Sequence, residues 1–248
     1  MELEYKPTYA QPGKRWNIYF LEFMLIFMAV ALGFFAESIR EDLGDQDKEK
    51  EFIASMIEDA ITDSVHLQNA INGNQKRLLK LDSLSKLLCR FKERPGVDSE
   101  IYRLYRFGIN HPEFVSPTER TMTQLKNAGG MRLIRKKPAV DAIVQYDDMS
   151  KNLVDQQAYY ELYQNKSLEQ AVVILNFQDF NFEMEKLGPN SNIYTNSALL
   201  THDKAKLIEF GNRVTIYAGI VQFYIFRLKE MKEQARTVIT TLQKEYPL

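Results

Sequence analysis

Residues 18–36 read IYFLEFMLIFMAVALGFFA, an apolar run that contains one charged residue, Glu22, and no proline. At about 1.5 Å of rise per residue, a helix of this length spans roughly 28 Å, close to the hydrocarbon thickness of a bilayer. Trp16 and Tyr19 fit an interfacial aromatic belt at one end. The run therefore predicts a single transmembrane helix in the lipid bilayer, preceded by an N-terminal tail of residues 1–17.

A cleaved signal peptide is the alternative explanation, because Ala29-Val30-Ala31 matches the small-x-small cleavage pattern. Glu22 interrupts the apolar region, however, and the run stays apolar beyond the cleavage pattern, so we expect a retained anchor. The numbers of Lys and Arg residues near the two ends of the apolar run are almost balanced. Lys14 and Arg15 directly precede the span, which favours a cytoplasmic N-terminus and a periplasmic main domain at a bacterial inner membrane.

The composition limits the classes of partner and of chemistry. The 248 residues carry a formal net charge of −1, so the chain lacks the electrostatic footprint of a nucleic-acid-binding protein. The single cysteine, Cys89, excludes an intramolecular disulfide framework. The three histidines are far apart in sequence, and nucleophile motifs and phosphate-binding loops are missing. We therefore expect no cofactor, no metal site and no enzymatic activity.

Heptad spacing of small and apolar residues predicts a long helical region over residues 37–94. The pattern keeps its phase across Asn72-Gly73-Asn74, which is either a turn between two antiparallel helices or a soft point in one helix. We favour one nearly continuous helix, which Arg94-Pro95-Gly96 ends. The stripe comprises Ile53, Ile57, Ala60, Ser64, Leu67, Ile71, Asn74, Leu78, Leu81, Ser85 and Leu88.

Residues 95–248 are expected to form a helical bundle domain. Ser116-Pro117-Thr118-Glu119 has the sequence of a capping box with Ser116 as the N-cap, and it predicts a helix over residues 117–128. Gly129-Gly130 would end this helix. The other expected elements are a short helix near residues 99–107, a helix from Pro138 into residues 177–180, and a loop over residues 187–198.

The last helix, expected from Thr201 as the N-cap to Glu245, has the most regular pattern. A stripe of this regularity is typical of an intramolecular bundle core or of a homo-oligomeric coiled coil. The candidate interaction stripe is Leu207, Val214, Val221, Leu228 and Leu242, with Ala235 in the same register. Its companion position holds Phe210, Tyr217, Tyr224, Met231 and Val238.

Three stretches carry a family resemblance: YFLEFMLIFMAVALGFFAESIRE at residues 19–41, EKEFIASMIEDAITD at residues 49–63, and SPTERTMTQLKNAGGMRLIRKKPAVDAIVQYDD at residues 116–148. Together they resemble a family of uncharacterised single-pass membrane proteins of Bacteroidota. The resemblance implies an N-terminal span followed by an α-helical domain, and it carries over no catalytic or binding residue.

The sequence thus predicts an all-α fold in which one N-terminal transmembrane helix precedes an elongated helical bundle with coiled-coil character. We expect a scaffold or accessory subunit that acts through protein–protein interaction, in a homo-oligomer or a larger membrane complex. Glu22 in the span suggests an alternative, an energy-coupling or channel-associated subunit, and Gly33 would allow close helix approach. A ligand-sensing helical domain is a further alternative.

Overall fold

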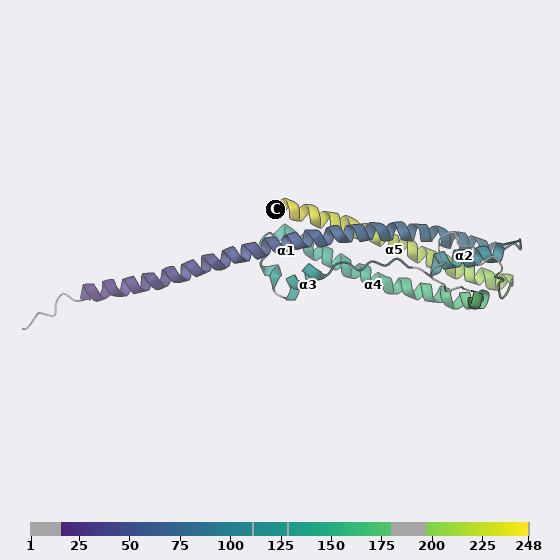
Figure 1. The fold of residues 1–248 in the computed structure, drawn as a ribbon, viewed down its shortest axis with the longest axis horizontal. Helices are drawn as coiled ribbons and strands as arrows, with labels where there is room; N and C mark the ends of the chain where they lie inside the picture. Colours follow the sequence, from purple (N-terminus) through teal and green to yellow (C-terminus); the bar gives the residue numbers. More distant parts are fainter. Residues whose placement is uncertain (1–15, 111, 128, 180–196, 248) are drawn as a thin grey trace, which may run out of the picture. The chain divides into compact units, whose positions relative to one another are not determined.

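The computed structural model describes residues 16–110, 112–127, 129–179 and 197–247, and over these residues it contains helices and no strands. Residues 1–15 of the expected tail therefore lie outside the described residues, and so do residues 187–196 of the expected loop. The α-helices of the structure are α1 Trp16–Cys89, α2 Val97–Ile109, α3 Arg120–Asn127, α4 Lys137–Ile174 and α5 Lys204–Glu245 (Figure 1). Two short 3₁₀ turns lie at Gly130–Arg132 and Phe177–Asp179.

The chain divides into two compact units, Met1–Glu51 and Phe52–Leu248. In the first unit, the apolar side chains of α1 are exposed, and Phe34 reaches 74 % exposure. An 18-residue window of this helix has a mean hydropathy of 2.3 and contains no buried residue. The helix is therefore long and apolar enough to cross a membrane, a property that a signal sequence shares.

Helix α1 continues through Asn72-Gly73-Asn74, which confirms the prediction of one continuous helix. It ends at Cys89, five residues before the expected stop at Arg94. Gly96 precedes α2 with a φ of +78°, a conformation that glycine adopts without steric cost. The second compact unit begins at Phe52, whereas the sequence led us to expect the bundle domain from residue 95.

The second unit is built on three long helices that run side by side: α1 from Phe52 onward, α4 and α5 (Figure 1). Side chains join them through hydrogen bonds from Tyr146 to Asp63, Arg77 to Tyr160, Lys232 to Gln68 and Ser85 to Gly211. In the first two pairs, the residue number on α4 rises as the residue number on α1 rises, so α4 runs parallel to α1. In the last two pairs, the residue number on α5 falls as the residue number on α1 rises, so α5 runs antiparallel to α1.

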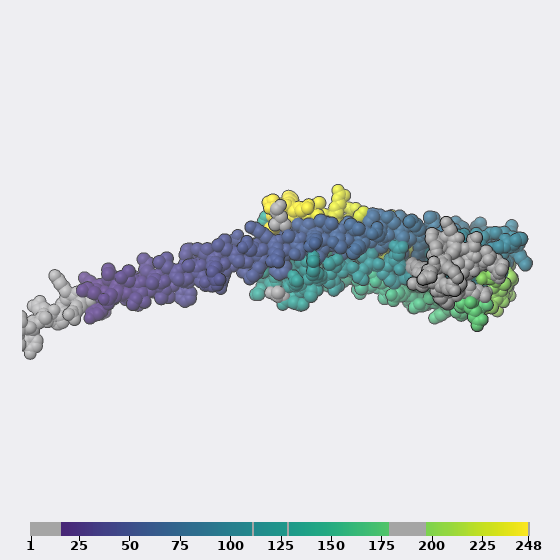
Figure 2. All heavy atoms as spheres, viewed as in Figure 1, coloured from purple at the N-terminus to yellow at the C-terminus, as the bar shows by residue number. Residues whose placement is uncertain are grey.

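The parallel helices α1 and α4 need a long connection between the end of one and the start of the other. Residues 90–136, which include α2 and α3, form this connection, which we call the crossover. The chain passes back along the bundle in this crossover before α4 starts. Figure 2 shows α3 and the segment before it, in teal, lying along α1 of the second unit. The crossover therefore places residue 108 and residue 118 against two different parts of the same helix, α1, at Arg77 and Asp63.

The α5 stripe is buried in the chain's own core. Of the two alternatives for such a stripe, the structure shows the intramolecular one, so these side chains offer no exposed surface to a partner. The candidates Leu207, Val214, Val221, Leu228 and Leu242 are each 0 % exposed. All five companion residues of the stripe are buried as well.

In α1 the first position of the predicted heptad is correct, and the predicted companion position is correct in part: Ile71 and Ser85 are buried, whereas Ile57, Ser64 and Leu78 are half-buried. Residues 53, 60, 67, 74, 81 and 88 are buried, as predicted. The companions that are buried at every repeat lie one residue earlier, and they are Met56, Asp63, Ala70, Arg77 and Leu84. Asp63 and Arg77, two of these buried companions, are charged, so a search for apolar spacing selects neighbouring residues instead.

Two predicted helix starts are wrong. The capping-box helix begins at Arg120 rather than at residue 117, and Ser116 is exposed and is not the N-cap; residue 128 lies outside the described residues. Helix α5 has Asp203 as its N-cap instead of Thr201, and the Asp203 carboxylate accepts the Lys206 N–H at 3.0 Å. Both differences arise because a nearby carboxylate is a stronger acceptor for free helix N–H groups than a hydroxyl.

Candidate functional site

The two candidates in the apolar run, Glu22 and Gly33, are exposed on α1 in the first unit. Glu22 makes no hydrogen bond or ion pair within the described part of the chain. A Cβ added at Gly33 would meet no heavy atom within 4 Å. The single chain therefore gives these residues no partner among the described residues, and the roles inferred for them stay predictions.

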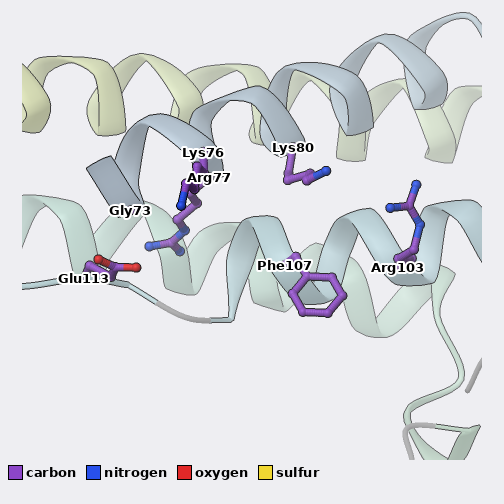
Figure 3. A pocket seen from close by; sticks show the side chains of 7 residues that line it. All are labelled: Gly73, Lys76, Arg77, Lys80, Arg103, Phe107 and Glu113. Carbon is purple, nitrogen blue, oxygen red and sulfur yellow. The ribbon is translucent and has the colours of Figure 1, made fainter. Parts of the chain in front are cut away.

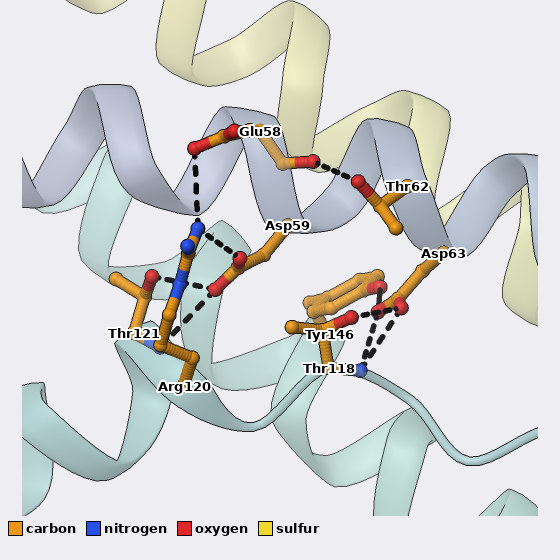
Figure 4. A network of polar contacts seen from close by, with 8 residues as sticks. All are labelled: Glu58, Asp59, Thr62, Asp63, Thr118, Arg120, Thr121 and Tyr146. Atoms are coloured by element: carbon orange, nitrogen blue, oxygen red, sulfur yellow. Dashed lines mark hydrogen bonds and ion pairs between the residues drawn. The ribbon is translucent and has the colours of Figure 1, made fainter.

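A buried carboxylate, Asp63, fixes the crossover to α1 (Figure 4). Its oxygens accept the Thr118 N–H at 2.9 and 3.1 Å, the Thr118 hydroxyl at 2.7 Å and the Tyr146 hydroxyl at 2.5 Å. Asp63 is 0 % exposed. Burial and the bond to this carboxylate raise the pKa of Tyr146, so the phenol remains a neutral donor.

Asp59, one helical turn before Asp63, holds the start of α3 (Figure 4). It accepts the Thr121 N–H at 3.1 Å and the Thr121 hydroxyl at 2.5 Å, and it pairs with Arg120 at 2.7 Å. These contacts satisfy an N–H group that a helix start leaves free, and they place negative charge at its positive end. The two carboxylates thus act as a structural clamp between α1 and α3.

A buried arginine, Arg77, occupies the middle of the bundle and is 4 % exposed. Its guanidinium donates to the carbonyl oxygens of Gly108 at 2.5 Å and Ile109 at 2.6 Å, to the Tyr217 hydroxyl at 2.5 Å and to the Tyr160 hydroxyl. It also lies 5.3 Å from the ring centroid of Tyr160 and 5.4 Å from that of Tyr217. Within the described residues, no carboxylate forms an ion pair with it.

Beside Arg77, a cavity of about 330 Å³ opens between α1, α2 and the segment that follows α2 (Figure 3). We call it the cationic pocket. Its lining residues are Gly73, Lys76, Arg77, Lys80, Arg103, Phe107 and Glu113. Four cationic side chains and one carboxylate give the lining a formal charge of +3.

A second hollow, of about 360 Å³, lies between α4 and α5 and is lined by Gln156, Tyr159, Ile220, Phe223 and Tyr224. We call it the aromatic groove. Tyr159 is 59 % exposed and Phe223 is 51 % exposed. Phe226, next to the groove and 53 % exposed, stacks on Phe223 with ring centroids 6.3 Å apart. Exposed aromatic side chains gathered in this way are typical of interaction surfaces.

Several of these residues were missed in the sequence. Asp59 and Asp63 are four residues apart, as are Lys76 and Lys80, so each pair was visible as one face of a helix. Nothing local links Arg103 to the lysines, because only the crossover brings α2 beside α1. Among the described residues, no group of three His, Cys, Asp or Glu side chains has an arrangement that would hold a metal ion.

Comparisons with protein-family models, with curated proteins and with solved structures found no match for this chain. Its function is therefore argued from its own residues and their geometry.

Proposed function

We propose that this chain is a membrane-anchored helical scaffold or accessory subunit that acts through protein–protein contacts of its bundle. In this proposal the apolar run of α1 is a retained span in a bacterial inner membrane, with a cytoplasmic N-terminus and a periplasmic bundle. The resemblance to single-pass membrane proteins of Bacteroidota is part of the same proposal.

The exposed apolar run supports the anchor. Its side chains between Ile18 and Phe35 are large, apolar and more than two-fifths exposed at almost every position, with Phe34 at 74 %. Apolar surface of this extent is unfavourable in water and favourable in a hydrocarbon phase. Membrane insertion removes it from water without any rearrangement of the bundle.

The aromatic groove is the observation that carries the interaction. Beside its lining, α5 presents Ile216, Gly219 and Phe226 on the exposed side, and a Cβ added at Gly219 would meet no heavy atom within 4 Å. A glycine flanked by large apolar side chains allows the backbone of another helix to approach closely. We therefore infer that the partner presents a helix with an apolar face, which packs on α5 over Gly219 and inserts a side chain between Tyr159 and Phe223.

The proposal is tested with the 248-residue chain purified in detergent, in which a photo-crosslinking amino acid replaces Phe223 or, as a control, Leu79. Leu79 is an exposed apolar residue of α1, at 68 % exposure, away from the α4–α5 groove. We expect irradiation to link the Phe223 variant into one complex of defined mass and to leave the Leu79 variant unlinked. A complex of multiples of this chain indicates a homo-oligomer, and a stoichiometric foreign subunit indicates an accessory chain.

A second measurement uses Phe223→Ser with Phe226→Ser, and Leu79→Ser as the matched control. The paired change removes two rings that are each more than half exposed, so we expect the bundle to keep most of its thermal stability. We expect the complex to dissociate only in the paired variant. A complex of unchanged mass and affinity in that variant would contradict the role of the groove.

Glu22→Gln separates the scaffold from an ion-coupled subunit. Glutamine keeps the size and polarity of the side chain but cannot carry a proton. A scaffold should insert and assemble as before, whereas loss of function with normal insertion and assembly would favour energy coupling.

A further inference from the structure

The cationic pocket contains an unbalanced cluster of positive charge. Lys76 and Lys80 lie one turn apart on α1, and Arg103 lies on α2. Within the described part of the chain, none of these three side chains forms a hydrogen bond or an ion pair. In Figure 3 the Lys80 ammonium extends toward the side where the Arg103 guanidinium rises from α2. Like charges brought to one cavity repel each other unless an anion lies among them.

Arg77 adds a fourth charge at the inner wall of this pocket. A guanidinium has five N–H donors, and four hydrogen bonds to described residues are formed. All four acceptors are neutral, so the buried charge is solvated but not neutralised. An anion in the pocket would lie next to this charge in a setting where electrostatic attraction is stronger than in water.

The one carboxylate in the lining does not neutralise the cluster. Glu113 forms no ion pair with any described cation, and its carboxylate lies against the backbone of Gly73, where a Cβ would collide with it. Its backbone carbonyl accepts a hydrogen bond from Asn74 at 2.8 Å, which fixes this segment to α1. Most of the positive charge therefore stays available to a ligand.

The chemistry of the lining selects the class of ligand. An arginine binds oxyanions through a planar fork, and lysines add point charges from other directions, so the set suits a group with several anionic oxygens. Phe107 is half-buried and offers an apolar wall. A volume of about 330 Å³ is at the lower end of the range of small-molecule sites.

We propose that the cationic pocket binds a phosphorylated anion, with its phosphate oxygens among Lys76, Lys80 and Arg103. The phosphate belongs either to a soluble phosphate ester or to a lipid headgroup. The site is independent of the proposed scaffold contact, because the aromatic groove lies on α4 and α5 and shares no lining residue with it.

The first test measures binding of inorganic pyrophosphate to the full chain by isothermal titration calorimetry, in nanodiscs of phosphatidylcholine at physiological salt. We expect saturable binding with one site per chain. Lys80→Gln with Arg103→Gln should weaken binding at least tenfold, and Lys80→Arg with Arg103→Lys should restore most of it. These two residues are at the pocket and outside the core, and circular dichroism checks that the fold is kept.

The matched control is Lys229→Gln with Lys244→Gln, which changes the net charge by the same amount. Both lysines are exposed on α5 and form no ion pair with described residues. We expect this control to bind pyrophosphate within twofold of the unchanged protein. Absence of saturable binding by the unchanged protein, or equal weakening in both double variants, would overturn the proposal.

A second arm identifies the source of the phosphate. Nanodiscs that contain phosphatidate in addition to phosphatidylcholine should weaken pyrophosphate binding if a lipid headgroup competes for the pocket. Unchanged affinity in those nanodiscs would identify a soluble phosphate ester as the ligand.

Discussion

Replacing Asp63 with alanine removes the acceptor of three donors at the point where the crossover is fixed to α1. The Thr118 N–H, the Thr118 hydroxyl and the Tyr146 hydroxyl all donate to this carboxylate. Since Asp63 is 0 % exposed and Tyr146 is 2 % exposed, water does not reach the Tyr146 hydroxyl in the folded state. The variant therefore leaves a buried donor without an acceptor.

The expected loss of stability follows from these three bonds. An unsatisfied buried hydroxyl such as that of Tyr146 costs about 1–3 kcal/mol. The two Thr118 donors are only partly buried and can turn to water, so each costs roughly 0.5–1 kcal/mol. Asp63→Ala should then lower the free energy of unfolding by about 3 kcal/mol, a large share of a typical total of about 5–15 kcal/mol.

The assay is urea unfolding of the full chain in detergent, followed by the loss of helical circular dichroism. The control is Asp82→Ala, which removes an exposed ion pair with Lys86 and should cost about 1 kcal/mol or less. Asp63→Asn keeps one acceptor oxygen and should fall between the two. A double-mutant cycle of Asp63→Ala with Tyr146→Phe should show a coupling of about 1–2 kcal/mol.

Two results would refute this reasoning. If Asp63→Ala and Asp82→Ala cost the same, the buried carboxylate does not hold the crossover. If the coupling with Tyr146→Phe is zero, any loss at Asp63 comes from a source other than the hydrogen bond between them.

Three further predictions concern packing and pH. Gly211→Ala should destabilise the bundle by about 1–3 kcal/mol, because the added Cβ would lie 2.5 Å from the Cys89 Sγ. Gly219→Ala should stabilise it by about 0.5–1 kcal/mol, because the added Cβ would meet open space, and urea unfolding compares the two variants. Burial raises the pKa of Tyr224 to about 12 and raises that of four other buried tyrosines. Their stabilising contribution is complete below about pH 10 and is lost above it, so absorbance at 295 nm should show these phenols ionising only as the bundle unfolds. Burial opposes ionisation of Asp147, but hydrogen bonds from two lysines outweigh it and lower its pKa. Asp147→Asn should therefore be less stable than the unchanged chain at neutral pH. Acid titration of unfolding should show this difference shrinking as the pH falls below about 4 and vanishing below the lowered pKa of Asp147.

Helix geometry alone allowed much of the fold to be predicted from the sequence. A face of a helix recurs every three to four residues, so apolar spacing predicted α5 nearly to its ends and predicted that α1 continues past Asn72-Gly73-Asn74. The apolar run at residues 18–36 was likewise recognisable, because hydropathy and length are properties of the local sequence.

Polar residues in the core were not readable in this way. Asp63 and Arg77 occupy the heptad position that Met56, Ala70 and Leu84 share, yet a search for apolar spacing passes over them. Their burial is stable because Thr118 and Tyr146 on one side and two tyrosines and two carbonyls on the other supply hydrogen bonds. Those partners are 31 to 140 residues away in sequence.

The sequence by itself determined the approximate extent of the long helices, which face of α5 is buried and which run is apolar enough for a membrane. Only the tertiary structure decided that α4 lies parallel to α1, that carboxylates of α1 rather than Ser116 hold the start of α3, and that Arg103 joins Lys76 and Lys80 at one pocket. The physical reason is that periodicity follows from the geometry of a single helix. The pairing of helix faces depends instead on the packing and hydrogen bonding of the whole chain at once.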